Sequence, residues 1–162
     1  GAYKNGFHGD AARTVFIGSV PEEAQQLVRV TRECFFEGIR FAKPGYRISD
    51  IAKAIQAHAE RHGYGVVRDL VGHGIGRQMH EDPEVPNFWV AGRFEYNPRL
   101  VAGMTIAIEP MINLGTARVL QMDDGWTVVT ADHKPSAHYE NTVLITEGEP
   151  RLLTLHEEEE DA

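Results

Sequence analysis

The segment MTIAIEPMIN, residues 104 to 113, reads as a β-strand and decides the fold class, because β-rich segments continue from it along the rest of the chain. The further segments are RVLQM (118–122), WTVVT (126–130) and HYENTVLIT (138–146). Asp124-Gly125, which lies between two of them, is typical of a tight hairpin turn. The second half of the chain is therefore predicted to form antiparallel strands.

The first half of the chain carries two strand-like segments and two helical patterns. FHGDAARTVFIG (7–18) ends in β-branched and aromatic residues and predicts a strand. Pro21 and Glu22-Glu23 predict a helix start, and an apolar stripe continues from there until Pro44-Gly45. A second helix is predicted from Ser49, a candidate N-cap, to His62-Gly63, followed by a short strand over 64–67. Helices followed by antiparallel strands indicate an α+β fold, with the helices against one side of a sheet.

The composition indicates one globular domain without a membrane segment. The chain has 162 residues, of which 42% are hydrophobic and 25% charged, values that are ordinary for a folded protein. No apolar run has the length of a membrane span, and no basic-then-apolar start predicts a signal peptide. The single cysteine, Cys34, is expected to be a small buried hydrophobe rather than a nucleophile. A cytoplasmic protein is expected.

The formal net charge of −8 is concentrated at one end of the chain. The run from Glu157 to Asp161 contains only acidic residues, so residues 156–162 are predicted to be a disordered acidic tail that follows a single domain over 1–155. No basic footprint remains elsewhere, which argues against nucleic-acid binding.

Three carboxylates lie inside predicted strands. Asp10 stands between Gly9 and Ala11, Glu109 follows an apolar run, and Glu140 precedes another. A carboxylate buried in a sheet costs several kcal/mol unless it is paired, protonated or bound to a metal. One such acid would most often lie at a strand edge and face water, but three in separate strands favour a common ligand. Within these strands Arg13 is the only cationic side chain, so a divalent cation is the expected partner.

The segment LVGHGIGRQMHEDP (70–83) contains two histidines, His73 and His80, which are candidates to join the three carboxylates. It lacks the lysine of a phosphate-binding P-loop, and neither the dinucleotide fingerprint nor the HExxH zinc pattern is present. His73 lies between glycines, where close approach to other groups is possible; the alternative is that His73 and His80 are ordinary loop histidines. Three carboxylates with one imidazole suit manganese, iron, cobalt or zinc, and two such ions bridged by carboxylates activate water for hydrolysis.

Four segments together resemble the motifs of type I methionine aminopeptidases, in order and spacing, from residue 1 to about 155. They are NGFHGD (5–10), GHGIGRQMHEDP (72–83), AGMTIAIEPMIN (102–113) and DGWTVVTADHKPSAHYENT (124–142). The resemblance implies the pita-bread fold, an antiparallel sheet with helices on its outer face and two divalent metal ions in the concavity. It also implies removal of the initiator methionine from nascent chains whose second residue is small.

The resemblance assigns roles to individual residues. As metal ligands it implies Asp10, His73, Glu109 and Glu140, with Asp10 and Glu140 bridging the ions. Glu109 would also accept a proton from the attacking water. His80 would contact the scissile peptide group, and Met79 and Trp126 would line the pocket for the methionine side chain.

Two departures from the family pattern qualify the resemblance. Asn141 stands where the family often has histidine after the ligand glutamate. The first aspartate ligand of the family would fall just before Gly1, so the chain is expected to match the C-terminal two-thirds of the enzyme, with a fold incomplete at the N-terminus and impaired activity on its own.

Two other functions stay open at this point: a proline-specific pita-bread peptidase and a non-catalytic binding module of the same fold. The implied partners are nascent polypeptide N-termini, and a ribosome contact is left open. For the full-length enzyme the monomer is expected.

Overall fold

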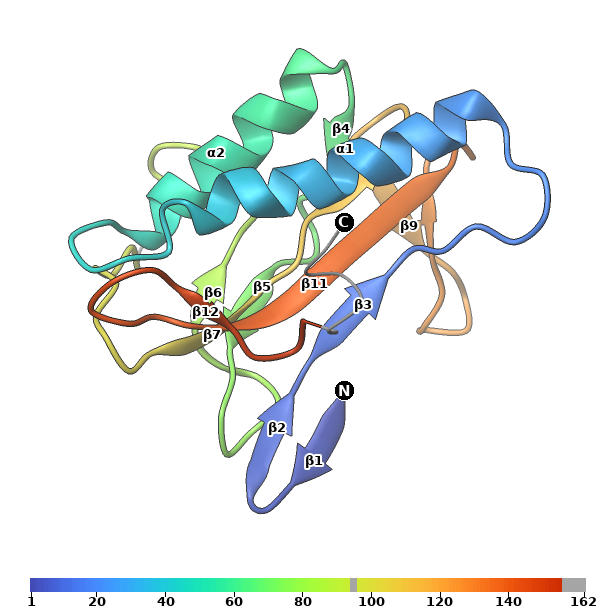
Figure 1. Ribbon diagram of the computed structural model, residues 1–162. Coiled ribbons are helices and arrows are strands. Elements are labelled where there is room, and N and C mark those ends of the chain that lie inside the picture. Colours follow the sequence, from blue (N-terminus) through green and yellow to red (C-terminus); the bar gives the residue numbers. More distant parts are fainter. Residues whose placement is uncertain (94–95, 156–162) are drawn as a thin grey trace.

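The computed structural model describes residues 1–93 and 96–155, so the predicted acidic tail at 156–162 lies outside the described residues. The helices are α1 (Glu22–Ile39) and α2 (Ile48–Arg61). The strands are β1 (Ala2–Lys4), β2 (Phe7–Gly9), β3 (Ala11–Arg13), β4 (Gly65–Val66), β5 (Gly72–Gly74), β6 (Glu81–Val85), β7 (Thr105–Ile108), β8 (Met111–Asn113), β9 (Val119–Gln121), β10 (Val128–Thr130), β11 (Ser136–Leu144) and β12 (Arg151–Leu152). Figure 1 shows both helices on one face of the sheet, which confirms the predicted α+β class.

The main sheet is organised around β11. Its strand order is β4-β8-β11-β7-β5-β6, and β3 and β12 also pair with β11. Every pairing between these strands is antiparallel. Strand β11 runs through the centre of the sheet (Figure 1), so its side chains contact both the helical layer and the opposite face.

Helices α1 and α2 pack closely on each other and on the sheet. The predicted apolar faces are buried, including Leu27 and Phe35 on α1 and Ile51 and Ile55 on α2. An ideal Cβ built on Gly38 would lie 2.8 Å from Ile55 Cγ1, so this glycine permits the close helix crossing. Neither helix in the described part of the chain has the length and apolar composition of a membrane span.

The predicted N-cap of α2 is wrong by two positions. The helix begins at Ile48, and the backbone N–H of Arg47 donates to Asp50 Oδ2 at 2.8 Å. Ser49 lies inside the first turn, where its backbone N–H donates to Asn97 Oδ1. The N-cap is Arg47, and the Asp50 side chain accepts the hydrogen bond from its backbone N–H.

Two strand predictions are corrected by the structure. Residues 14–18 are not a strand: pairing with β11 ends at Arg13, and Val15 and Ile17 are exposed as the chain crosses toward α1. The segment 104–113 is two strands, because Pro110 has no N–H to donate to the ladder. The hairpin β9–β10 forms as predicted. Strands β5 and β6 had no strand signal in the sequence.

Candidate metal centre

The face of the sheet that carries the site follows from the alternation of side chains along β11. Tyr139 packs on α1, with its ring centroid 5.2 Å from that of Phe35. Side chains on a strand alternate between faces. Glu140 therefore points away from the helices, together with His138 and Thr142.

Five side chains converge on this helix-free face, and we call them the central cluster: Asp10, His73, Glu109, His138 and Glu140. They form two groups in which one ligand atom from each residue lies within 4.8 Å of the others. One group is Asp10, His73 and Glu140, and the other is Glu109, His138 and Glu140. Glu140 belongs to both groups. The four metal ligands expected from the sequence are therefore brought together.

Two of the three acids lie at interruptions of strands. Asp10 lies between β2 and β3, and Glu109 lies between β7 and β8 beside Pro110. Glu140 alone lies within a regular strand, β11. The interruptions let Asp10 and Glu109 turn toward Glu140, because a side chain at a break is not bound to the alternation of the strand.

His73 is fixed in both position and tautomer. Its Nδ1 lies 2.9 Å from the carbonyl oxygen of Gly74, so Nδ1–H donates there and the Nε2 lone pair is directed to the cluster. His73 Nε2 lies 3.6 Å from Glu109 Oε1. An ideal Cβ on Gly74 would lie 2.2 Å from the carbonyl oxygen of Asp82, so only glycine permits the close approach of β5 and β6 here. This confirms the close approach expected beside His73.

Thr142 holds the backbone of Asp10 beside β11. The Asp10 N–H donates to Thr142 Oγ1 at 2.9 Å, and Thr142 Oγ1–H donates to the Asp10 carbonyl oxygen at 2.9 Å. The backbone N–H of Thr142 donates to the same carbonyl oxygen at 3.1 Å. Asp10 is thereby anchored to the strand that carries Glu140.

The donor set fits divalent cations on its own chemistry. Burial, followed by the neighbouring carboxylates of Glu109 and Asp10, raises the pKa of Glu140 to about 7, against a lowering effect of His138. Glu140 Oε1 and His138 Nε2 are buried and have no hydrogen-bond partner among residues 1–93 and 96–155. Carboxylates crowded in this way, with polar atoms left unpaired, are a poor arrangement without a cation and a good one around it.

His138 joins the cluster although it was not expected there. Its Nε2 lies 3.5 Å from Glu109 Oε2 and 4.0 Å from Glu140 Oε2. The signal was present in the sequence, because a residue two positions before Glu140 on one strand shares its face.

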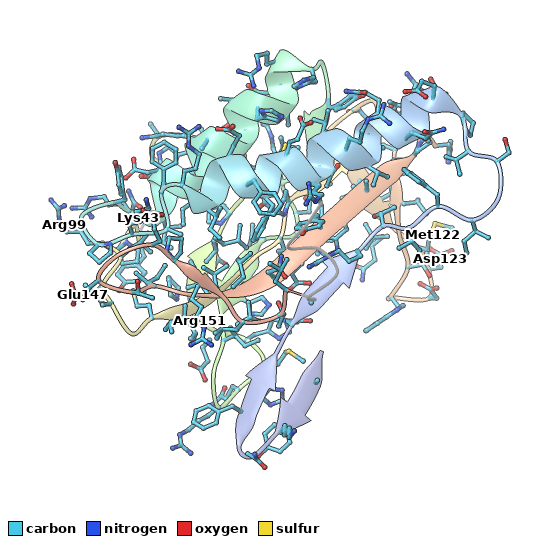
Figure 2. The ribbon with its side chains drawn as sticks, viewed as in Figure 1. Lys43, Arg99, Met122, Asp123, Glu147 and Arg151 are labelled. Atoms are coloured by element: carbon cyan, nitrogen blue, oxygen red, sulfur yellow. The ribbon has the colours of Figure 1, made fainter. Side chains whose placement is uncertain are left out.

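The three residues expected to contact substrate lie in two different places. The rings of His80 and His73 are 4.2 Å apart, and both residues line a pocket of about 590 Å³. An ideal Cβ on Gly1 would lie 2.0 Å from Met79 Cε and 3.5 Å from Asp10 Oδ1, which places Met79 beside the cluster. Trp126 lies in the exposed β9–β10 hairpin and is 88% exposed. Met122 and Asp123 mark this hairpin in Figure 2.

Asn141, the departure from the family pattern, faces the helical layer. Its Oδ1 accepts hydrogen bonds from Arg13 Nη2 at 2.9 Å and from Thr154 Oγ1 at 3.0 Å. Arg13 also donates to the carbonyl oxygen of Glu140 and lies over the Tyr139 ring at 4.1 Å. Asn141 therefore supports the strand behind Glu140 and does not enter the cluster.

Cys34 is buried in α1, and burial raises the pKa of its thiol to about 12. The expected role as a small core residue is consistent with this environment, because a thiol with such a pKa is not a nucleophile at neutral pH.

Comparisons with known proteins agree with this geometry. The model of Metallopeptidase family M24 matches residues 1–147. A methionine aminopeptidase of Clostridium perfringens is 58% identical over 155 residues, which cover 96% of this chain and 61% of that protein. Methionine aminopeptidase 1 of Bacillus subtilis is 46% identical over 154 residues, 95% of this chain and 61% of that protein. The chain thus spans about three-fifths of the length of these curated relatives.

Solved structures give the same result for the fold. The methionine aminopeptidase of Thermotoga maritima matches with a TM-score of 0.88 at 46% identity, over 94% of this chain and 60% of that one. A prolidase from Pyrococcus furiosus matches with a TM-score of 0.73 at 26% identity, over 94% of this chain and 39% of that one. The curled antiparallel sheet with helices on one face is the pita-bread fold expected from the sequence. With these matches and its cluster of carboxylates and imidazoles, the chain belongs to metallopeptidase family M24.

Proposed function

We propose that this chain carries the catalytic centre of a methionine aminopeptidase, which removes an N-terminal methionine when the second residue is small. The observation that supports it most is the central cluster: three carboxylates and two histidines on one face of the main sheet, in a chain of a metallopeptidase family. The relatives with 45–58% identity are methionine aminopeptidases, and the prolidase structure is only 26% identical. The methionine enzyme is therefore favoured over a proline-specific peptidase.

In this proposal two divalent ions of manganese, iron, cobalt or zinc would be held by Asp10, His73, Glu109 and Glu140. When bound, the ions polarise the scissile carbonyl and lower the pKa of a water molecule. His138 would be an additional candidate ligand, because its Nε2 lies 3.5 Å from Glu109 Oε2. Glu140 would be a ligand common to both ions, because it belongs to both groups of ligands. The resemblance gives Asp10 the same role.

Glu109 is the proposed proton acceptor. Its carboxylate lies between His73 and His138, 3.6 Å and 3.5 Å from their Nε2 atoms, and its side chain is 13% exposed. A carboxylate in this position can take a proton from the attacking water and pass it to the leaving amine. His80, against His73 at the pocket, orients the scissile peptide group.

Substrate selection is assigned to the walls of the pocket. Met79 beside Asp10 offers a polarisable side chain to the thioether of a substrate methionine. Trp126 is exposed in the β9–β10 hairpin, and its place in this wall rests on the resemblance alone. A large second residue would collide with groups around the ions, so alanine, glycine and serine are the favoured second residues. The substrates are nascent polypeptide N-termini, and the compartment is the cytoplasm, where those chains are made.

The test offers Met-Ala-Ser and Ala-Pro-Ser peptides to the chain with Mn²⁺, alone and fused to the part of the Clostridium perfringens relative that it does not match. We expect release of methionine from the first peptide by the fusion, lost on Glu109→Gln. Preferred cleavage of the Ala-Pro peptide would favour the proline-specific enzyme. Metal binding without cleavage of either peptide would favour a binding module.

A further inference from the structure

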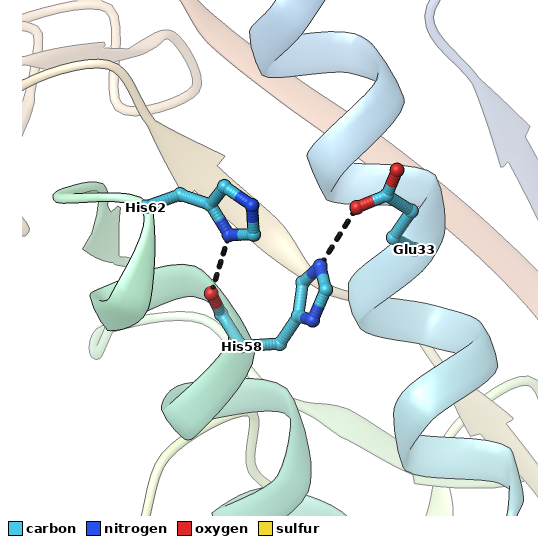
Figure 3. A group of neighbouring side chains, drawn as sticks. All are labelled: Glu33, His58 and His62. Atoms are coloured by element: carbon cyan, nitrogen blue, oxygen red, sulfur yellow. Dashed lines mark hydrogen bonds and ion pairs between the residues drawn. The ribbon is translucent and has the colours of Figure 1, made fainter.

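A second group of potential metal ligands lies on the opposite side of the sheet, in the helical layer. It consists of Glu33 on α1 with His58 and His62 at the end of α2, and we call it the helix cluster. One ligand atom from each residue lies within 4.8 Å of the others. Figure 3 shows the carboxylate and both rings converging between the two helices. The proposed peptidase makes no use of these residues.

Each imidazole of the helix cluster has a defined tautomer. His62 Nδ1 lies 2.9 Å from the carbonyl oxygen of His58, so Nδ1–H donates there and the lone pair is on Nε2. Backbone-anchored imidazoles of this kind are typical of metal ligands. His58 Nδ1 accepts a hydrogen bond from Arg61 Nη2 at 2.7 Å, so Nε2–H donates to Glu33 Oε2 at 2.8 Å. One proton thus occupies the position between His58 and Glu33 that a cation could take.

The different exposures of the three side chains suit a site that closes on an ion. His58 is 8% exposed and is fixed by the helix packing, whereas Glu33 and His62 are exposed. Tetrahedral zinc places its ligand atoms about 3.4 Å apart. Glu33 can make this adjustment by rotation about its side-chain bonds, while His58 is held by the helix packing and His62 by its hydrogen bond to the His58 carbonyl oxygen.

We propose that Glu33, His58 and His62 form a zinc site that clamps α1 to α2. Two imidazoles with one carboxylate suit zinc better than magnesium or calcium, which prefer oxygen ligands throughout. Residues four apart on a helix share a face, so His58 and His62 can bind one ion. When zinc binds His58 Nε2, the proton on that atom moves to Nδ1, and the imidazole stays neutral. Arg61 must leave Nδ1, so Arg61 competes with the metal.

The experiment measures zinc bound by the 162-residue chain by equilibrium dialysis, followed by metal analysis. His62→Asn keeps a side-chain donor for the His58 carbonyl and removes the metal-binding lone pair. The matched control is His133→Asn, the same change at an exposed histidine outside both clusters. We expect His62→Asn to bind one zinc equivalent fewer than the control, or to bind that equivalent at least about tenfold more weakly. Zinc at the central cluster is common to all variants and cancels in the comparison.

A second pair of variants tests the competition. Arg61→Met is expected to tighten zinc binding several-fold relative to Lys53→Met, which removes one positive charge from the exposed face of the same helix. Equal zinc stoichiometry and affinity in His62→Asn and His133→Asn would overturn the site. Equal affinities of Arg61→Met and Lys53→Met would overturn the proposed exchange between Arg61 and the metal. Neither readout depends on peptidase activity.

Discussion

Glu140 is the residue of the central cluster with the most unfavourable surroundings in the absence of metal. Its side chain is 6% exposed, it lies near Asp10 and Glu109, and its pKa is raised to about 7. In the unfolded chain its pKa is near the ordinary 4.5. The folded state therefore holds a proton to higher pH, and its stabilisation, complete below pH 4.5, is lost as the pH rises to about 7.

We predict that Glu140→Gln stabilises the metal-free chain at pH 8 and not at pH 4.5, because the amide is neutral at both. The gain at pH 8 has an upper bound of about 3 kcal/mol, from the size of the pKa shift. Urea unfolding in the presence of a chelator measures it. Glu84→Gln, at an exposed carboxylate of β6, is the control, and an equal effect of both variants would remove the special status of Glu140.

His80 and His73 are adjacent but have different proposed roles. We predict that His80→Ala lowers peptidase turnover by about 10²-fold or more and leaves the metal content of the chain unchanged. His73→Ala, the matched control, is expected to lose bound metal. Metal analysis of both purified variants, with turnover measured on the fusion described above, separates the roles. Loss of a full equivalent from His80→Ala would make His80 a metal ligand.

Single residues also show where reasoning from the sequence succeeds. The meeting of Asp10, Glu109 and Glu140 could be predicted because buried acids without cations require a common partner. His73 was expected beside them from its place between glycines and from the resemblance. His138 could not be separated from ordinary polar residues by composition, although its register with Glu140 was readable. Trp126 is assigned from the resemblance alone. Its exposure in the β9–β10 hairpin depends on tertiary packing, which no local sequence pattern encodes.

At the scale of elements, the periodic segments were predictable and their ends were not. The helices α1 and α2 follow from apolar stripes and from Pro21 and Pro44. Residues 14–18 have strand composition but no partner strand in the structure, and pairing decides strand formation more than composition does. Strand β5 has little strand propensity because two of its three residues are glycine. These glycines permit the close approach to neighbouring strands.

The contact between β5 and β6 yields a prediction. Gly74→Ala should destabilise the chain by about 1–3 kcal/mol, because the new methyl group would overlap the Asp82 backbone and displace His73. Gly148→Ala is the control, since its Cβ would meet nothing within 4 Å and its φ is not in the left-handed region. Urea unfolding of both variants measures the difference. A change below about 0.5 kcal/mol in Gly74→Ala would show that the strands move apart freely.

At the scale of the whole molecule, the sheet separates two groups of ligands. The central cluster is on the face opposite the helices, and it holds three carboxylates for two proposed ions. Both groups of ligands in this cluster include Glu140. The first ion to bind therefore neutralises part of the carboxylate charge available to the second ion, and it also repels that ion.

We predict that Mn²⁺ binds the chain with two unequal affinities, the second at least about tenfold weaker than the first because of this repulsion and the shared ligand. Calorimetric titration of His62→Asn, in which the helix cluster is disabled, measures both. Two equal and tight equivalents would contradict the shared role of Glu140.

The pairing of β3 with β11 sets the order in which the central cluster can assemble. Asp10 and Thr142 are 132 residues apart in sequence, so their hydrogen bonds close one of the longest loops in the molecule. The α1–α2 pair and the β9–β10 hairpin close much shorter loops and are free to form early. Loop closure over long separations is slow and is compensated only by the contacts that follow. The complete set of ligands for a metal ion therefore forms only late in folding. The ion stabilises chains in which β3 has already paired with β11.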